Sequence, residues 1–437
     1  MQDDKEDWAI QSQEMSRVFE NALFVVAACS SPDTSTPFLG PHAPSDRLDS
    51  ATFSLSSPSG DINHIRARDT THIYFPELTG PLETRGWTWQ ERELSNRIIN
   101  FLSLEVLWTC KETTYYEHGI VKDEDQSPWS TDITPTNAGD QDFSSDSWLR
   151  CIWDYSSRNL TYATDRLPAI SGMAARFHAI RQCDYYAGFW YDNLPICLGW
   201  IVDSRTCAPN RIPLALENSV PSWSWASVSG TATWAHRFHA FPRGDFAEKY
   251  RVRVEPNIEV IEINCKPATQ NKSGEVSAGG FLKLRGKAVD AYMECDGLGR
   301  GFVRRHGFAP QLVQPDCLLT SDSDEKIDGP IKGGLVALST LRRARQAESK
   351  QDPSIRTKGS VVCVLLYSTF DDGNSEKHKR SAFVLVLGKA GRDSAMYERI
   401  AAGTGRHGPI YAGRQDWDEW KGWGGSRRVD LLGEMVF

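Results

Sequence analysis

Apolar residues near the start of the chain recur at helical spacing. Within residues 4–22, one face of a helix collects the apolar side chains Trp8, Met15, Val18, Phe19 and Ala22. Asp3 or Asp4 can cap this helix, because the helix dipole favours negative charge in the first turn. The continuous apolar run from Leu23 to Cys29 is typical of a buried parallel strand. The pattern therefore predicts one helix-to-strand step of an α/β sheet.

The next part of the chain alternates polar stretches with short apolar runs. Residues 32–72 are rich in Ser, Pro, Gly and Asp, which predicts long loops and a hairpin that includes residues 52–55. A short helix is expected at 88–93, and strands are expected at 97–102 and 106–110.

A polar, acidic stretch at 122–147, with Pro128, Pro135 and Gly139, indicates a linker. Helices are predicted beyond it at 148–155 and 167–180, and short β-type runs alternate with polar insertions after residue 250. We therefore expect an α/β domain, a linker, a helical and Trp-rich region and a β-rich α+β region. Their expected bounds are 1–121, 122–147, 148–250 and 251–437.

Composition narrows the class of protein. The 437 residues carry a formal net charge of -8 and no long basic stripe, which argues against a nucleic-acid-binding protein. No apolar run is long enough for a membrane span, and the acidic N-terminus is unlike a secretory signal. Cys29, Cys197 and Cys363 lie in apolar runs, and no C-x-x-C pair occurs, which indicates buried thiols rather than a metal site. These features predict a cytoplasmic protein.

One polar block differs from the rest of the pattern. Residues 85–95 read Arg-Gly-Trp-Thr-Trp-Gln-Glu-Arg-Glu-Leu-Ser, so two tryptophans lie among several charged side chains. A surface helix avoids large aromatics and a buried helix avoids charges, so this block must pair its polar groups beside a packed aromatic layer. The block resembles the R-G-W-T-x-Q-E-R-x-L-S motif of the fungal heterokaryon incompatibility (HET) domain.

Other segments carry the same resemblance. Residues 2–8, Gln-Asp-Asp-Lys-Glu-Asp-Trp, resemble the Q-D-D-x-x-E-W segment of that family. Four later segments resemble motifs commonly found downstream of HET domains: residues 155–161, 165–172, 186–190 and 221–227. The family's usual upstream strands have no counterpart, so we expect a truncated HET domain that lacks its N-terminal part.

The resemblance implies a fold and a function. The HET domain is regarded as a distant relative of the TIR fold, so a partial TIR-like α/β domain is expected. The family's role implies allorecognition in a filamentous fungus, in which activation triggers programmed cell death as a form of innate immunity. Such a module works through protein partners or self-association and needs no cofactor. An inert, truncated paralogue is an alternative interpretation.

An enzymatic hypothesis also stays open. Some TIR domains hydrolyse NAD with one glutamate, and the resemblance makes Glu14 and Glu91 the candidate catalytic carboxylates. This chemistry requires a carboxylate beside the ribose in a site that excludes bulk water. Helix capping and a solvated helix face are the favoured interpretation of Glu14 and the other carboxylates of the first helix. The G-x-G-x-x-G match at 403–408 is followed by Pro409 rather than by a helix, so we interpret it as a turn and not as a dinucleotide site.

Two interpretations remain for the motif residues. They either line a ligand or effector pocket, or Glu91 and an arginine lock a buried corner while the indoles pack into the core. The residues concerned are Arg85, Gly86, Trp87, Gln90, Glu91 and Arg92. The same choice, between a ligand site and a buried turn, applies to Pro221, Trp223 and Trp225.

Overall fold

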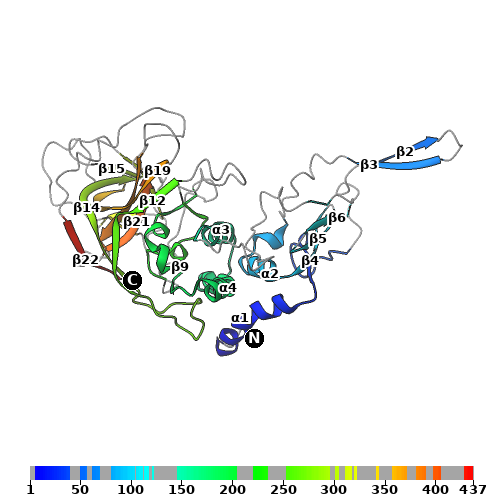
Figure 1. The fold of residues 1–437 in the computed structure, drawn as a ribbon, viewed down its shortest axis with the longest axis horizontal. Coiled ribbons are helices and arrows are strands. Elements are labelled where there is room, and N and C mark those ends of the chain that lie inside the picture. Colours follow the sequence, from blue (N-terminus) through cyan, green and yellow to red (C-terminus); the bar gives the residue numbers. More distant parts are fainter. Residues whose placement is uncertain are drawn as a thin grey trace. The chain divides into compact units, whose positions relative to one another are not determined.

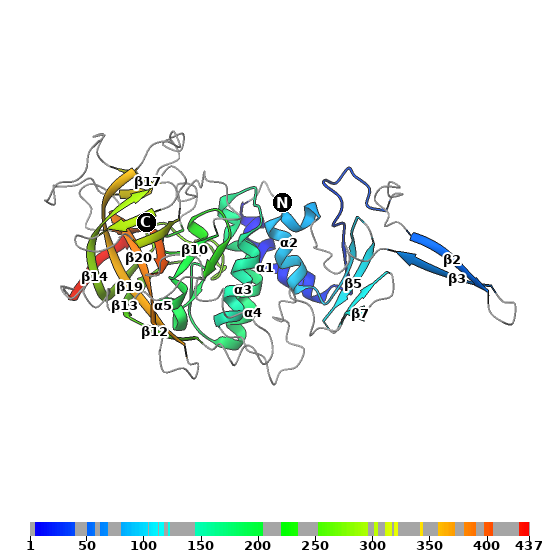
Figure 2. The same cartoon turned by 90° about the horizontal axis from the view of Figure 1, so that it is seen from above.

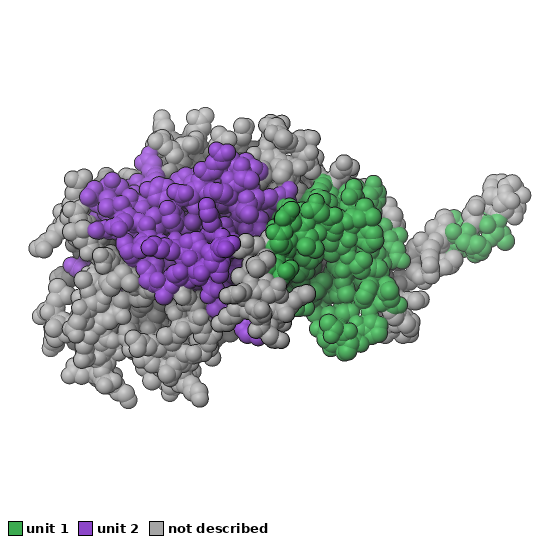
Figure 3. Space-filling model, turned by 90° about the horizontal axis from the view of Figure 1, so that it is seen from below, with its two compact units in different colours: residues 1–142, 158–160 green, residues 143–157, 161–437 purple. Residues whose placement is uncertain are grey.

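A computed structural model divides the chain into two compact units. Unit 1 comprises residues 1–142 and 158–160, and unit 2 comprises residues 143–157 and 161–437 (Figure 3). The structure describes residues 5–39, 50–56, 62–68, 80–103, 105–111, 113–117, 121–122, 145–203, 220–234, 252–295, 301–304, 311–316, 319–321, 341–343, 357–371, 380–389, 397–404 and 428–436.

Unit 1 contains a sheet with the strand order β1-β4-β5-β6-β7 (Figure 1). β1 runs parallel to β4, and the other neighbouring strands are antiparallel. Strands β2 and β3 form a separate hairpin. The elements are α1 Lys5–Asn21, β1 Val25–Ala27, β2 Ser50–Ser56, β3 Ile62–Arg68, a 3₁₀ turn Pro81–Thr84, α2 Gly86–Leu94, β4 Arg97–Phe101, β5 Val106–Cys110, β6 Thr114–Tyr116 and β7 Val121–Lys122.

The predicted first helix and the parallel strand after it are confirmed, but the prediction that this strand is buried is wrong. Leu23, Phe24 and Val26 are all exposed. Leu23 and Phe24 precede the strand, Val26 lies in it, and among the described residues β1 pairs with β4 alone. The predicted hairpin and the elements expected near 88–93, 97–102 and 106–110 are also confirmed.

Unit 2 begins with helices. α3 Ser145–Ser156 and α4 Ser171–Arg181 lie side by side (Figures 1 and 2), and the Trp148 and Phe177 rings join them with centroids 5.1 Å apart. The predicted helix at 167–180 starts later than expected. Pro168 opens the 3₁₀ turn Pro168–Ile170, and the α-helix follows only at Ser171. The remaining elements of this part are α5 Leu194–Cys197, β8 Tyr185–Tyr186, β9 Phe189–Trp190, β10 Trp200–Val202 and β11 Ala232–Trp234.

The predicted β-rich region is confirmed as an antiparallel sheet of long strands. In the described residues its order is β12-β19-β20-β21-β16-β15-β14-β13, and the path closes on itself because β14 also pairs with β19. β22 pairs with β14 beside this path, and β17 and β18 form a separate two-stranded sheet. The strands of the region are β12 Val252–Pro256, β13 Ile258–Asn264, β14 Phe281–Cys295, β15 Gly301–Arg304, β16 Gln311–Pro315, β17 Leu319–Ser321, β18 Leu341–Arg343, β19 Thr357–Asp371, β20 Arg380–Lys389, β21 Tyr397–Thr404 and β22 Arg428–Val436. The chain thus mixes helices and strands, as expected.

The downstream motifs meet in an aromatic core of unit 2. The Trp148 indole N–H donates to the Gly188 carbonyl over 2.8 Å, and the Ser224 hydroxyl donates to the Ala187 carbonyl over 2.6 Å. Gly188 adopts a φ of +99°, and a Cβ there would lie 2.3 Å from the Trp225 indole nitrogen. Only glycine fits this turn, so side chains of residues 221–227 pack directly against the backbone of residues 186–190.

A buried arginine completes this core. The Arg166 guanidinium lies 5.2 Å from the centroid of the Trp225 ring and donates to the Gly230 carbonyl over 3.0 Å. The Tyr155 hydroxyl donates to the Arg166 carbonyl over 2.8 Å. The motifs at 155–161, 165–172 and 221–227 therefore share one packing function. Within the described chain, no helix has the length and apolar character needed to cross a membrane.

The two tryptophans of the polar block differ in burial, which gives a stability prediction. Trp89 is fully buried, whereas Trp87 is half-buried. We expect Trp89→Ala to lower the free energy of unfolding by roughly 3–5 kcal/mol, because it leaves a cavity. Trp87→Ala should cost clearly less, because part of its indole is already hydrated. Urea unfolding followed by circular dichroism measures both values, and equal losses would contradict the assignment.

Candidate functional site

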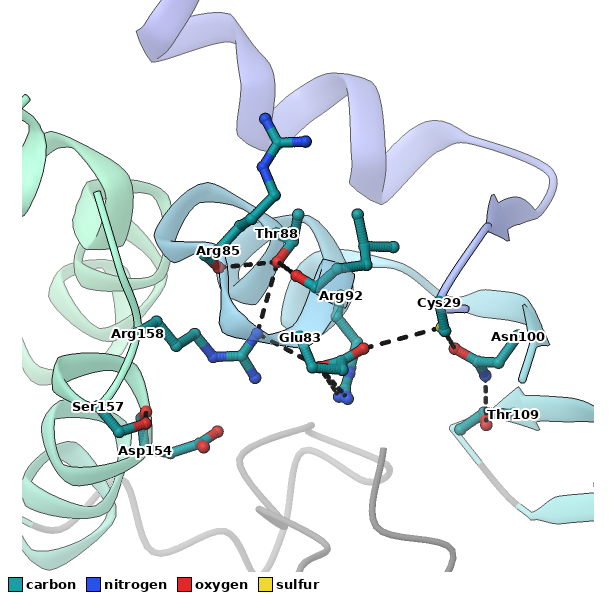
Figure 4. A network of polar contacts seen from close by, with 11 residues as sticks. Cys29, Glu83, Arg85, Thr88, Arg92, Asn100, Thr109, Asp154, Ser157 and Arg158 are labelled. Carbon is teal, nitrogen blue, oxygen red and sulfur yellow. Dashed lines mark hydrogen bonds and ion pairs between the residues drawn. The ribbon is translucent and has the colours of Figure 1, made fainter. Parts of the chain in front are cut away.

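The polar block of unit 1 is organised around the Glu83 carboxylate (Figure 4). Glu83 lies in the 3₁₀ turn Pro81–Thr84, and α2 starts immediately after the extended residue Arg85. We define the Glu83 network by its members Cys29, Glu83, Thr88, Arg92, Asn100 and Arg158.

Two guanidinium groups share one oxygen of Glu83. Arg92 donates to Oε2 through Nη1 over 2.6 Å and through Nη2 over 2.7 Å, and Nη1 of Arg158 lies 3.3 Å from the same oxygen. The side chains of Glu83 and Arg158 are only 12% and 7% exposed. Little water screens this ion pair, so removing one partner would leave a charge buried without compensation.

The backbone around Arg158 pairs with the start of α2. The Gly86 amide donates to the Asn159 carbonyl over 2.7 Å, and the Asn159 amide donates to the Thr84 carbonyl over 2.6 Å. A Cβ on Gly86 would lie 2.4 Å from Cδ2 of Leu160. The glycine of the R-G-W motif is therefore needed for close approach of residues 158–160, because a side chain at this position would occupy the space of Leu160.

Thr88 links the two sides of this junction. Its hydroxyl lies 2.7 Å from the Leu82 carbonyl and 2.8 Å from the Arg85 carbonyl, so it can donate to either. The hydroxyl also accepts from Nη1 of Arg158 over 3.5 Å. Thr88 therefore holds the turn before α2 in the shape that receives Arg158.

Cys29 and Asn100 close the network on the side of the sheet. The Cys29 thiol lies 3.9 Å from Oε1 of Glu83 and 3.7 Å from Oδ1 of Asn100. The Asn100 amide donates to the Thr109 hydroxyl over 3.2 Å. Burial raises the pKa of the Cys29 thiol to about 12, and the nearby Glu83 carboxylate acts in the same direction. The thiol is therefore protonated at neutral pH and serves as a hydrogen-bond donor rather than as a nucleophile.

This geometry favours a structural role for the network. The Glu83 oxygen that faces the arginines already accepts two hydrogen bonds from Arg92 and pairs with the charge of Arg158, so it is poorly placed to accept a proton from a substrate. The network instead fixes the 3₁₀ turn, α2 and residues 158–160 with respect to one another.

The family model described as Heterokaryon incompatibility protein (HET) matches residues 1–91. Residues 1–91 carry a HET-family segment. No curated protein and no solved structure matches the chain. The HET segment includes Cys29 and Glu83, whereas Arg92, Asn100 and Arg158 lie beyond its last matched residue. At the level of the family, the match connects the chain with heterokaryon incompatibility.

The structure separates the motif residues that the sequence groups together. Arg85 is exposed and points away from Glu83 in Figure 4, whereas Gly86 and Gln90 are buried. Glu91 is half-buried and faces the charge of Arg85. Of the candidate motif residues, Arg92 belongs to the Glu83 network, where its carboxylate partner is Glu83.

The other candidate residues lie elsewhere. Glu14 is exposed on α1 and forms an ion pair with Arg17 over 3.0 Å. Pro221, Trp223 and Trp225 are buried in the core of unit 2. Among the described residues, no group of three His, Cys, Asp or Glu side chains is placed to hold a metal ion.

Sequence reasoning missed Glu83 and Arg158 as network members. Arg158 lies in the recognised motif at 155–161, and Glu83 comes two residues before the R-G-W motif. The two motifs therefore indicated which parts of the chain contain these residues. Their pairing was not predictable, because it depends on a contact between segments that are far apart in the chain.

A paired substitution tests the energetic importance of the network. We expect Glu83→Gln to lower the free energy of unfolding by roughly 3 kcal/mol, because two arginines lose their shared carboxylate in a buried environment. The matched control is Glu14→Gln, which removes an exposed ion pair and should cost less than about 0.5 kcal/mol. Urea unfolding of both variants provides the comparison. A loss for Glu83→Gln no larger than that of the control would contradict the role of Glu83.

The environment of Glu91 predicts a dependence on pH. Burial raises the pKa of the Glu91 carboxyl, while the Arg85 guanidinium acts in the opposite direction. A raised pKa means that the folded state disfavours the ionised form, so its stability falls as pH rises through the raised pKa. We expect Glu91→Gln to stabilise the protein at pH 7 and to have no effect at a pH below the ordinary pKa of glutamate. Thermal unfolding across this range is the measurement, and a destabilised variant at pH 7 would show that the carboxylate makes a favourable contact.

Proposed function

We propose that the chain acts in heterokaryon incompatibility as a self/non-self recognition module linked to programmed cell death. In this proposal it signals in the cytoplasm through contacts with other proteins. The HET match over residues 1–91 supports the biological process. The surface of unit 1 supports the mode of action.

The observation that carries the proposal is the exposed apolar surface of unit 1. Among the described residues, unit 1 exposes nine large apolar side chains and the longer unit 2 exposes four. Those of unit 1 are Val18, Leu23, Phe24, Val26, Leu39, Phe53, Leu55, Ile62 and Tyr115. Contiguous exposed apolar surface is a feature of protein interaction sites, and Leu23, Phe24 and Val26 are neighbours in the chain. The unit that contains the HET segment therefore has the character of an interaction module.

The parallel pair β1–β4 supports a related proposal about the fold. The chain passes through α2 between these two parallel strands, which is the basic connection of an α/β sheet. We assign the TIR-like relationship to this part of unit 1.

NAD hydrolysis is the competing function, and the candidate carboxylates do not favour it. Glu14 is exposed to solvent and paired with Arg17, whereas the reaction needs a carboxylate in a site that excludes water. Glu91 is half-buried on α2 and lies near the charge of Arg85. The next charged residue of the helix, Arg92, forms an ion pair with Glu83. The interaction role is therefore the better supported of the two.

Inducible expression of the full chain in a filamentous fungus tests the proposed function. We expect growth arrest and loss of viability on induction, with the cellular NAD content unchanged before cells die. Glu83→Gln should weaken the response, because it loosens the HET segment, and Glu14→Gln should retain it. Normal growth at a high level of folded protein would contradict the proposal. Early NAD loss that Glu91→Gln abolishes would favour the enzyme instead.

A further inference from the structure

One exposed loop of unit 1 contains two hydroxyl residues that are each followed by a proline. The loop spans residues 31–37 and reads Ser-Pro-Asp-Thr-Ser-Thr-Pro, so the two pairs are Ser31-Pro32 and Thr36-Pro37. Residues 32–37 are all exposed, whereas Ser31 is half-buried. Thr36 is therefore the more accessible of these two hydroxyl residues.

The Asp33 carboxylate holds this loop closed. Its Oδ1 atom accepts from the hydroxyl and the amide of Ser35 over 2.7 and 2.9 Å, and from the amide and the hydroxyl of Thr36 over 2.9 and 3.0 Å. The Ser31 hydroxyl donates to the Thr36 carbonyl over 3.1 Å. Among the described residues, Ser35 and Thr36 form hydrogen bonds only within the loop. The closed shape therefore depends mainly on one carboxylate oxygen.

The two ends of the loop are fixed on the sheet. The Ser30 amide donates to the Phe101 carbonyl over 3.1 Å, and the Phe38 ring contacts the Phe101 ring with centroids 4.9 Å apart. Phe101 is the last residue of β4. Between these ends, the hydrogen bonds to Asp33 are exposed to water, so breaking them costs little free energy. The segment can therefore open to enter the cleft of an enzyme while its ends stay in place.

We propose that Thr36 is a phosphorylation site for a kinase that recognises a proline after the acceptor residue. The kinase transfers the γ-phosphoryl group of a nucleoside triphosphate to Oγ1 of Thr36. The new P–O bond forms as the bond to the β-phosphate breaks, an aspartate of the kinase accepts the hydroxyl proton, and a nucleoside diphosphate leaves. Pro37 supplies the recognition feature, because it has no backbone N–H and disfavours a helical conformation at Thr36.

The modification opens the loop for an electrostatic reason. Hydrogen bonds from Ser35 and Thr36 lower the pKa of the Asp33 carboxyl, so this group is negatively charged at neutral pH. A phosphate on Thr36 adds roughly two negative charges and removes the hydroxyl proton, so repulsion replaces a hydrogen bond at the same place. Phosphorylation thereby acts as a switch on the segment that follows Cys29 of the Glu83 network. This inference goes beyond the proposed function and does not depend on it.

Incubation of the purified full chain with a proline-directed Ser/Thr kinase and Mg-ATP tests the site, and mass spectrometry locates the phosphate. We expect it on Thr36. Pro37→Ala should lower the rate by about tenfold or more, because one recognition contact is lost, and Thr36→Val should abolish the modification. The matched control is Thr34→Val, which removes a neighbouring exposed hydroxyl that no proline follows and should leave the rate unchanged. Circular dichroism checks that each variant is folded.

Hydrogen exchange of the phosphorylated and the unmodified chain tests the switch. We expect the amides of Ser35 and Thr36 to exchange about tenfold faster or more after phosphorylation, because each loses a hydrogen bond to a charged acceptor. The Ser30 amide should keep its rate, because its bond to Phe101 lies at a fixed end of the loop.

Three results would overturn the proposal. The first is an unmodified Thr36 in the full chain under conditions in which the kinase modifies a peptide of residues 30–39. The second is a phosphate on Ser31 in place of Thr36, and the third is unchanged exchange at Ser35 and Thr36 after phosphorylation. Because these measurements use purified protein, their failure is separate from a failure of the cell-death assay.

Discussion

The Glu83 carboxylate accepts hydrogen bonds from Arg92 in α2 and forms an ion pair with Arg158, which comes from a distant part of the chain. Two guanidinium groups that approach the same oxygen with little solvent around them would repel each other without a shared anion. The conformation of the turn before α2, the approach of residues 158–160 and the close contact at Gly86 all depend on this charge balance. The same carboxylate also accepts a contact from the Cys29 thiol, which links the ion pair to the chain after β1.

The network also explains why a glycine and a threonine lie in the polar block. Gly86 gives space to Leu160, and Thr88 bridges the turn and Arg158. The downstream motifs follow the same principle in unit 2, where Gly188 gives space to the Trp225 indole. The motifs that mark the resemblance are thus mainly sites where backbone and large side chains come into close contact, and their tolerance to substitution is low for steric reasons.

Local pattern was sufficient to predict much of the fold. The first helix, the parallel strand after it, the strands that follow the polar block and the β-rich region all follow from periodicity and composition. The exposure of β1 was not predictable, because an apolar run does not reveal how many neighbours a strand has. The site was only partly predictable: the block was recognised, but the pairing of Glu83 with Arg158 depends on tertiary contacts.

A double-mutant cycle between Glu83→Gln and Arg158→Met tests the central claim most directly, since it isolates the interaction between the two side chains from the cost of each substitution. The network predicts a coupling energy of roughly 1–3 kcal/mol in the free energy of unfolding. Effects of the two substitutions that add within about 0.5 kcal/mol would show that the residues act independently, and would contradict the account.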